Sequence, residues 1–452
     1  MKCMRSILCL LLVLAFCVGC GAVPGTTPGT PSGTEAQYAL CKAVYPTYPA
    51  YVDAADYYQK NGSFDADGYE KALSRQAADY AALAIEPLSR EQTAGVLRFA
   101  ARTVPVICPG EENTVYSPVN LYLALAMLTE MADGDTQAQL LGLLEAGEIN
   151  ALRESAQQIW KNTYVSDGKT VCTLANSVWL NQQLPFHEET LQLLADSYYA
   201  SSYRVAMGTT EADSAIADWV NGQTGGLLNA QIQTDALQLL AIYSALYFKA
   251  AWQDAFSASQ TASDIFHTSD GKKETCDFMH MSCSGSYQKG ENYTAAVRYL
   301  KNSQDRMTFI LPDEGTSLKE VLASPTFFTE LSPAQNARIT WSLPKFDVSS
   351  RLDLIESLKS LGVTDAFDEN AADFSRISDQ EAVVDRINHV ARMKVDEEGI
   401  EAAAYTEITM KTTAAPAEEP LQVEMNLNRP FLVIVSTSDG LPLFVTAVCS
   451  PA

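Results

Sequence analysis

The spacing of hydrophobic positions predicts a chain in which helices and strands are mixed irregularly from residue 91 onward. Apolar residues recur every three or four positions, as in helices with one buried face, in residues 93–106, 118–131, 188–199 and 212–221. Runs typical of strands occupy residues 175–180, 239–248, 307–311, 338–343, 383–395, 431–437 and 443–448. Because the two kinds of element do not alternate regularly, the pattern favours an α+β fold over a doubly wound sheet.

One stretch near the carboxyl end, residues 395–413, fits more than one structure. Its Ala and Glu content favours a helix, whereas the Thr-, Ala- and Pro-rich residues that follow favour an exposed loop. Alternate residues nevertheless divide into two sets, as in a strand with one buried face. The charge-free set is Ile400, Ala402, Ala404, Thr406, Ile408 and Met410, and the other set contains Glu401, Tyr405, Glu407 and Lys411. A segment with two favourable conformations is what a conformational switch requires.

The amino terminus predicts export from the cytoplasm. Basic residues precede an apolar run at residues 7–18 that is too short to span a bilayer and is typical of a signal peptide. The run ends before Cys20 and resembles a bacterial lipoprotein signal, with residues 1–20 as the signal and Cys20 as the lipidated residue, although Cys17 stands where a Leu is usual. The alternative is cleavage to a freely secreted form.

Two segments separate this signal from the body of the protein. Residues 21–34 form a Pro/Gly/Thr-rich tether, which at about 3.1 Å per residue would hold the body roughly 40 Å from a membrane. Residues 35–90 are expected to form a helical extension, with helical spacing near residues 69–85. The sequence assigns this extension no function.

Composition narrows the possible partners. The formal net charge of −24 over 452 residues disfavours nucleic acid and anionic membrane surfaces, so a membrane would be reached only through the lipid anchor. Of ten cysteines, four lie in residues 1–20. The other six have no framework spacing, and their pairing stays open: Cys41, Cys108, Cys172, Cys276, Cys283 and Cys449.

The sequence does not favour an enzyme or a metal site. It has four histidines and neither an HExxH nor a GxSxG motif. Cys276, His280 and Cys283 have a CxxxHxxC spacing, but zinc would need a fourth ligand, so a surface hairpin is the better interpretation. We therefore expect no metal and no cofactor.

An ordered series of motifs resembles the serpins, the serine protease inhibitor superfamily. The motifs are NTVYSPVNLYLALAM (113–127), ANSVWL (175–180), DWVNGQTGG (218–226), LYFKAAW (246–252), MTFILP (307–312), LPKF (343–346), ADFSRIS (372–378), HVARMKVDEEGIEAAAYT (389–406) and NRPFLVIV (428–435). The resemblance implies a serpin domain over residues 91–452. Its expected fold has a large mixed main sheet, two smaller sheets, eight or nine helices and an exposed reactive-centre loop at about 397–425.

The resemblance also implies a mechanism. A serine protease, or a cysteine protease, cleaves the loop and forms a covalent acyl-enzyme, and the loop then inserts into the main sheet as a new strand and traps the protease. The hinge positions that match are Glu397, Gly399, Ile400, Ala402, Ala403, Ala404 and Thr406.

Small uncharged inward residues favour an active inhibitor, expected to be monomeric. Ile400 is bulkier than the usual Thr or Ser, and Tyr405, where a small residue is common, belongs to the outward set. The alternative is a noninhibitory serpin that serves as a cell-surface interaction module.

Further positions match family motifs. Ser117, Asn120, Ser244 and His389 correspond to a polar cluster beneath the sheet, with Asn120 and Ser244 exchanged relative to the usual Ser and Asn. The exchange would let these buried groups satisfy each other. Trp252 matches the tryptophan at the top of the sheet where insertion begins.

The position of the cleaved bond is the least constrained expectation. Counting sixteen residues on from Glu397 gives Thr413, with Ala414 after the bond, which would suit proteases that accept small residues. Because the stretch 399–430 is about six residues longer than in typical members, Lys411 and Met410 remain alternatives, which would attract trypsin-like and chymotrypsin-like enzymes.

Overall fold

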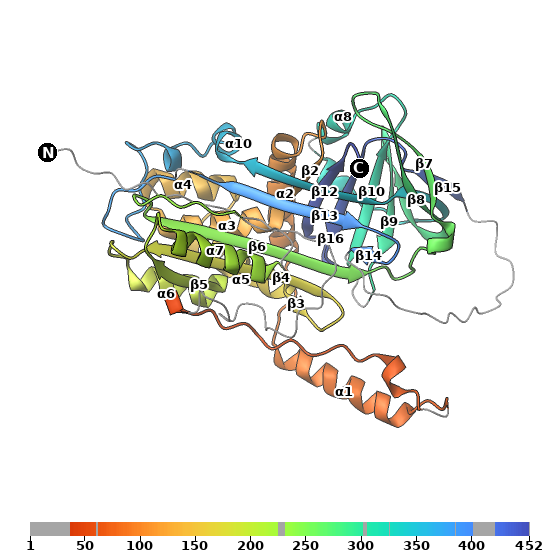
Figure 1. Cartoon of the computed structure of the whole chain (residues 1–452), viewed down its shortest axis with the longest axis horizontal. Helices are drawn as coiled ribbons and strands as arrows, with labels where there is room; N and C mark the ends of the chain where they lie inside the picture. The colour runs from red at the N-terminus through yellow and green to blue at the C-terminus, as the bar shows by residue number, and fades with distance from the viewer. Residues whose placement is uncertain are drawn as a thin grey trace.

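The computed structural model describes residues 37–59, 62–224, 231–301, 305–324, 326–384, 386–400 and 421–451. In these residues the strands form two mixed sheets, one of eight strands and one of nine. Helices cover the main, eight-stranded sheet, and the second sheet lies at one end of it (Figure 1). Within the same residues, no helix is both long enough and apolar enough to cross a bilayer.

The main sheet is mostly antiparallel, with one parallel pair between β4 and β5. In order across the sheet, its strands are β1 (Ala39–Cys41), β5 (Ala200–Val205), β4 (Val171–Asn181), β6 (Leu240–Ala251), β14 (Gly399–Ile400), β13 (Asn388–Val395) and β12 (Phe346–Asp353), and β3 (Val165–Ser166) pairs with β4.

The second sheet is organised by one long strand. β8 (Lys273–Lys289) pairs with three neighbours along its length. The order is β15 (Gln422–Asn426), β11 (Gln335–Pro344), β8, β9 (Tyr293–Tyr299), β10 (Arg306–Pro312), β16 (Phe431–Ser436), β17 (Pro442–Val448) and β2 (Thr114–Tyr116), and β7 (Ala262–His267) pairs with β8. The strands expected in two smaller sheets are therefore hydrogen-bonded in one continuous sheet, because β8 belongs to both parts.

The described residues contain ten α-helices, some of which cover the two faces of the main sheet. They are α1 (Ala66–Ala82), α2 (Arg90–Ile107), α3 (Pro118–Met131), α4 (Gly134–Leu143), α5 (Ile149–Thr163), α6 (Glu188–Tyr198), α7 (Thr210–Gln223), α8 (Leu318–Leu322), α9 (Phe327–Glu330) and α10 (Ile355–Ser360). Short 3₁₀ turns occur at Ala54–Tyr57, Ala258–Gln260 and Asp365–Phe367. α2 to α10, all within the described serpin-like region, agree with the expected eight or nine helices.

The central helix α3 covers one face of the main sheet. Every residue of α3 is buried, as expected for a helix that is apolar on all sides, and it packs against β6 on one face of the sheet while α7 packs on the other. Its one buried acid, Glu130, is paired in a bidentate ion pair with Arg153 at 2.8 Å and accepts a hydrogen bond from Tyr198 at 2.9 Å. The charge is thus compensated inside the core.

The predicted elements agree with the observed ones except at one strand. The run 383–395 was expected to be extended throughout, but β13 begins only at Asn388. Val383, Val384 and Ile387 are buried, and the backbone of Val384 bonds to Ala366 instead of to a strand. These residues are apolar because they pack in the core and not because they pair in a sheet. The prediction of a strand was wrong for the part of the run that precedes Asn388.

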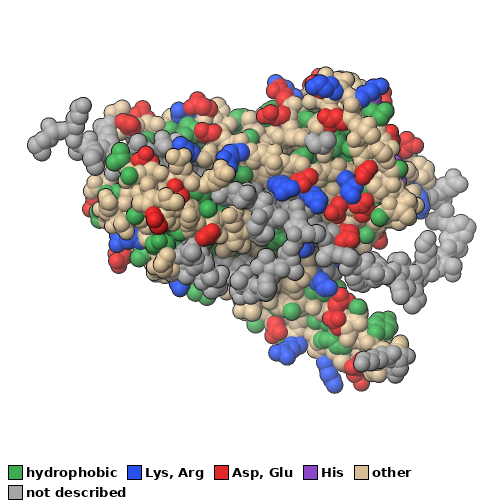
Figure 2. Space-filling model, viewed as in Figure 1, with side chains coloured by type: hydrophobic (Ala, Val, Ile, Leu, Met, Phe, Trp, Pro, Cys, Tyr) green, Lys and Arg blue, Asp and Glu red, His purple; other side chains and the backbone are tan. Residues whose placement is uncertain are grey.

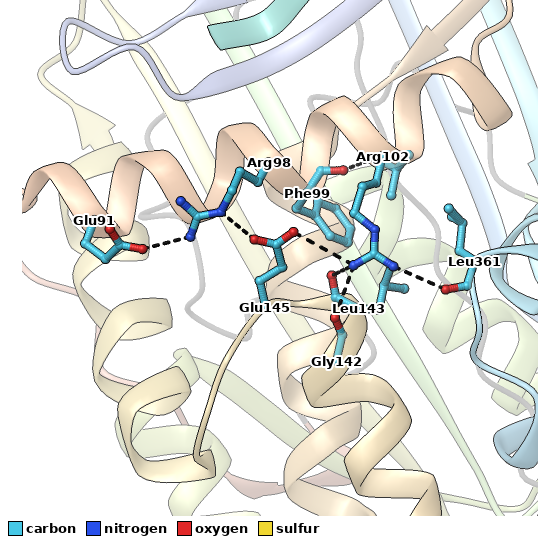
Figure 3. A network of polar contacts seen from close by, with 9 residues as sticks. Glu91, Arg98, Phe99, Arg102, Gly142, Leu143, Glu145 and Leu361 are labelled. Carbon is cyan, nitrogen blue, oxygen red and sulfur yellow. Dashed lines mark hydrogen bonds and ion pairs between the residues drawn. The ribbon is translucent and has the colours of Figure 1, made fainter. Parts of the chain in front are cut away.

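Charged side chains tie α2 to the helices beside it (Figure 3). Arg102 donates to the carbonyls of the last two residues of α4 at 3.1 and 3.4 Å, and to the carbonyl of Leu361 at 3.4 Å. A cation at the carboxyl end of a helix satisfies orphan carbonyls and complements the helix dipole. Arg98 pairs with Glu91 at 2.8 Å and also contacts Glu145.

The amino-terminal extension contains more than a helix. β1 pairs with the edge strand β5, and α1 projects from the body (Figure 1). Between them, the ring of Tyr45 lies 5.1 Å from Trp160, 5.6 Å from Tyr164 and 6.1 Å from Tyr199, all edge-on. Burial raises the pKa of Tyr45 well above its usual range, which is consistent with a partly buried tyrosine whose ring packs against the body.

On the face shown in Figure 2, Asp and Glu side chains are spread over the body with Lys and Arg side chains among them. The net negative charge of the chain is therefore distributed across this face and not gathered in one acidic patch. This face therefore offers no single acidic patch to a cationic partner.

Replacing Tyr45 with Ala should lower the apparent free energy of unfolding by about 3 kcal/mol, because a large aromatic ring leaves a packed cluster. Urea unfolding followed by circular dichroism measures this. Tyr58→Ala is the matched control: that side chain is 60% exposed, so its loss should change stability by no more than about 0.5 kcal/mol. Equal effects of the two variants would contradict the packing of Tyr45.

Candidate functional site

The two-residue strand β14 lies at the centre of the main sheet. Ile400 pairs with Ala250 of β6 on one side and with Val395 of β13 on the other. Among the described residues, pairing between the two halves of the sheet passes through β14 alone. The part of the sequence with two predicted conformations therefore begins inside the main sheet.

Gly399 is required by this close approach. Its φ is +148°, a value that side chains rarely adopt, and an added Cβ would lie 2.4 Å from the carbonyl oxygen of Ala250. Any other residue would force the chain away from β6. The glycine selected as a hinge from the sequence is thus the point where the chain turns into the sheet.

The turn that precedes β14, residues 396–398, is held by the end of β6. The backbone N–H of Trp252 donates to Glu398 O, and its indole Nε1 donates to Asp396 O, both at 2.9 Å. The backbone N–H of Phe256 donates to Glu397 O at 2.9 Å. Trp252, expected at the top of the sheet, therefore contacts the hinge directly.

The side chain of Glu397 is fixed by two groups that the sequence analysis did not identify. Lys345 Nζ lies 3.0 Å from its carboxylate, and Thr261 Oγ1 donates to it at 2.8 Å. Burial by itself would raise the pKa of Glu397, but hydrogen bonds from Lys345, from its own backbone N–H and from Thr261 outweigh it and hold the pKa below its usual value. Lys345 lies in the LPKF motif, which was the signal available in the sequence.

Beneath the sheet, three of the four expected polar residues are connected. Ser117 caps α3 by accepting a hydrogen bond from the backbone N–H of Asn120 at 3.3 Å. Ser244 Oγ contacts Asn120 Oδ1 and Asn176 Oδ1, the latter at 2.6 Å. Asn176, which the analysis missed although it lies in ANSVWL, donates to Tyr198 O at 3.0 Å.

His389 lies apart from these three residues in this state. Its ring centre is 5.3 Å from that of Tyr116. The backbone of Val115 is nearby, but neither ring nitrogen has a hydrogen-bond partner of normal geometry within the described residues. Burial lowers the pKa of His389 to about 3, although the backbone of Val115 acts in the opposite direction. The imidazole is therefore neutral near pH 7, with unused hydrogen-bonding capacity beneath the sheet.

The remaining predicted site residues lie outside the described residues. They are the hinge positions Ala402, Ala403, Ala404 and Thr406, the bond between Thr413 and Ala414 with its alternatives Lys411 and Met410, and the lipidation site Cys20.

The chain matches the protein-family model for serpin (serine protease inhibitor) over residues 96–451. Among curated proteins, it is similar to Serpin-ZX of Arabidopsis thaliana, with 28% identity over 75% of this chain and 92% of that protein. It is also similar to Serpin-Z1C of Triticum aestivum, with 29% identity over 78% of this chain and 95% of that protein.

Solved structures agree with this match. The native state of tengpin, a thermophilic serpin, superposes with a TM-score of 0.72 and 27% identity, covering 81% of this chain and 95% of that one. The native stressed conformation of Arabidopsis AtSerpin1 gives a TM-score of 0.69 at 24% identity, covering 81% and 100% of the two chains. The chain belongs to the serpin family, a family of protease inhibitors and not of enzymes.

Proposed function

We propose that this protein is a suicide-substrate inhibitor of serine endopeptidases, with cysteine endopeptidases as a second class of target. It would trap the acyl-enzyme by inserting its cleaved loop between β6 and β13. The observation that carries this proposal is β14, which already occupies the first two positions of such a strand. Among the described residues, β6 and β13 do not pair directly with each other, so a new strand could pair with both.

The register of β14 specifies where each later loop residue would pair. Each two-residue step forward along the loop moves two residues back along both neighbours, starting from Ile400 opposite Ala250 and Val395. Continued in this way, Ala402 would lie between Phe248 and Met393. Phe248 and Met393 are completely buried, so the face that receives the loop is apolar and inside the molecule.

The next two positions fit equally well. Ala404 would lie between Leu246 and Ala391, which are both buried. Thr406 would lie between Ser244 and His389, the two halves of the separated polar cluster. A threonine hydroxyl is both donor and acceptor, so Thr406 would supply a partner for the unpaired imidazole.

Insertion would also account for inhibition. About 14 residues at roughly 3.3 Å each span about 46 Å of strand, so a protease bound covalently at Thr413 would be carried far across the molecule. Ladder hydrogen bonds and burial of the loop face supply the free energy. The intact state must therefore be kinetically trapped above the inserted one.

Mixing the protein with elastase-like, trypsin-like and chymotrypsin-like serine proteases should give a covalent complex that survives boiling in detergent. Mass spectrometry should find a released carboxy-terminal fragment that begins at Ala414. A fragment that begins at Thr412 would assign Lys411 instead, and one that begins at Lys411 would assign Met410. The cleaved inhibitor should melt at a higher temperature than the intact one.

Cleavage without a stable complex, and without a gain in melting temperature, would favour the alternative of a noninhibitory interaction module. It would mean that the loop has no stored driving force to insert.

Thr406→Arg should convert the inhibitor into a substrate. The new side chain would be forced to enter the core, where an unpaired charge costs several kcal/mol, enough to slow insertion by more than about tenfold. The number of inhibitor molecules consumed per protease inactivated measures this. Tyr405→Arg, on the outward set, is the matched control and should leave that number close to the wild-type value; equal losses in both variants would contradict the proposed facing of the inserted strand.

We also propose that the mature protein is attached through Cys20 to the outer face of a bacterial cell membrane, where it would meet extracellular proteases. The signal-like residues 1–20 and the tether support this. A lipid anchor leaves the body of the protein in water.

Cys20→Ala should abolish incorporation of labelled fatty acid. The mature, membrane-anchored protein should then be lost, and the chain should either be released into the medium or accumulate as the precursor that retains its leader. Cys17→Ala, three residues earlier, should keep the anchor. A wild-type protein found free in the medium would instead support secretion without lipid.

A further inference from the structure

One buried cation lies behind the hinge without a carboxylate in contact among the described residues. Arg298 of β9 is 4% exposed, and its guanidinium lies against two aromatic rings, 5.4 Å from the centre of Trp252 and 4.7 Å from that of Phe256. One terminal nitrogen donates to the carbonyl of Asp254. Its Nε has no hydrogen-bond partner in the part of the chain that the structure describes, so the hydrogen-bonding capacity of the guanidinium is only partly used.

The other terminal nitrogen of Arg298 points at two sulfur atoms. Nη1 lies 3.0 Å from Met281 Sδ and 3.3 Å from Cys283 Sγ, and both residues come from β8, where they are partly exposed. Sulfur in a thiol or thioether is a weak hydrogen-bond acceptor. A buried guanidinium aimed at a partly exposed thiol is the kind of electropositive environment in which reactive cysteines are found.

The two other partly exposed thiols have the opposite surroundings. Burial raises the pKa of Cys276 to about 11, and Glu274, Asp277 and Asp264 add to the effect. The pKa of Cys41 is raised by burial and by Asp196. These acids would repel negative charge on the sulfur of Cys276 and Cys41. The two thiols therefore serve as internal controls for the reactivity of Cys283.

We propose that Cys283 is a reactive thiol and a site of covalent modification by peroxides and other small electrophiles, with Arg298 stabilising the negative charge that develops on its sulfur. With hydrogen peroxide, the sulfur attacks one oxygen, an S–O bond forms and the O–O bond breaks. Sulfur loses two electrons, and the departing hydroxide takes up a proton to become water. The product is a sulfenic acid, whose oxygen gives Arg298 a stronger acceptor than it has now.

The modification would reach the hinge through Arg298. A guanidinium drawn toward the new oxygen would lose part of its stacking on Trp252 and Phe256. Both residues donate backbone hydrogen bonds to the turn 396–398, and the indole of Trp252 adds a third. Oxidation of one surface-accessible sulfur would thus loosen the segment from which β14 starts.

The test is a competition among the thiols of the intact folded protein. Brief treatment with limiting iodoacetamide, or with hydrogen peroxide followed by a sulfenic-acid trap, is analysed by peptide mass spectrometry. Cys283 should react at least about tenfold faster than Cys276 or Cys41, because a cation replaces acids beside the sulfur. Arg298→Met should reduce the rate at Cys283 to that of the other two, and Arg298→Lys should restore part of it.

If Cys283 reacts no faster than Cys276 in the wild-type protein, the proposal is overturned. This comparison needs no variant, so it holds even if Arg298→Met fails to fold. An unchanged rate at Cys283 in a folded Arg298→Met protein would equally overturn the role of Arg298. For the link to the hinge, peroxide should lower the melting temperature of the wild-type protein by about 2–4 °C. The same treatment should not shift Cys283→Ser, in which Met281 remains oxidisable, and equal shifts in both proteins would overturn the link.

Discussion

Within the described residues, the two halves of the main sheet are joined only by the two-residue strand β14. β4 and β6 pair over ten residues and β12 and β13 over eight, whereas β14 contributes two residues between them. The long runs of hydrogen-bonded pairs make each half of the sheet rigid. In the part of the chain that the structure describes, the two halves are joined at one end only, by the two residues of β14. Gly399 makes this bridge possible because its missing side chain lets the chain pass against Ala250. In the proposed mechanism, every later step of loop insertion would start from that contact.

The polar groups beneath the sheet follow from the same arrangement. A core that never opened would be most stable with apolar residues there, because buried polar groups cost free energy unless each is paired. Instead, the network of Asn120, Ser244 and Asn176 lies on one side of the junction, and His389 lies on the other with its ring nitrogens unpaired. The protein carries unused hydrogen-bonding capacity at the position where a new strand would arrive.

Sequence reasoning predicted the long, strongly patterned elements well. α3 was predicted as residues 118–131 and is observed with those bounds. Ser117 and Pro118 are residues that favour a helix start, and a helix that is apolar on all sides must be buried in the core. The run 383–387 was mistaken for strand because burial alone makes a sequence apolar, whether or not it pairs. β1 was not anticipated, because three residues carry too little pattern to be distinguished from loop.

Contacts between distant parts of the chain were harder to predict than elements. Glu397 and Gly399 could be selected because they lie in one contiguous motif. The side-chain partners of Glu397, Lys345 and Thr261, lie more than fifty residues away from it, and no local pattern joins them to it. Arg298 is a stronger case: a single charged residue in a short strand gives no indication that two rings and two sulfurs surround it.

β1 has a consequence for the behaviour of the protein in a crowded environment. A sheet whose outermost strand is long and unpaired offers its backbone to other chains, and natural proteins cover such edges or shorten them. Here the chain's own β1 pairs with Ser202 and Tyr203 in the middle of the six-residue strand β5, and β1 itself is only three residues long. The amino-terminal extension therefore reduces the unpaired backbone that this edge of the sheet exposes.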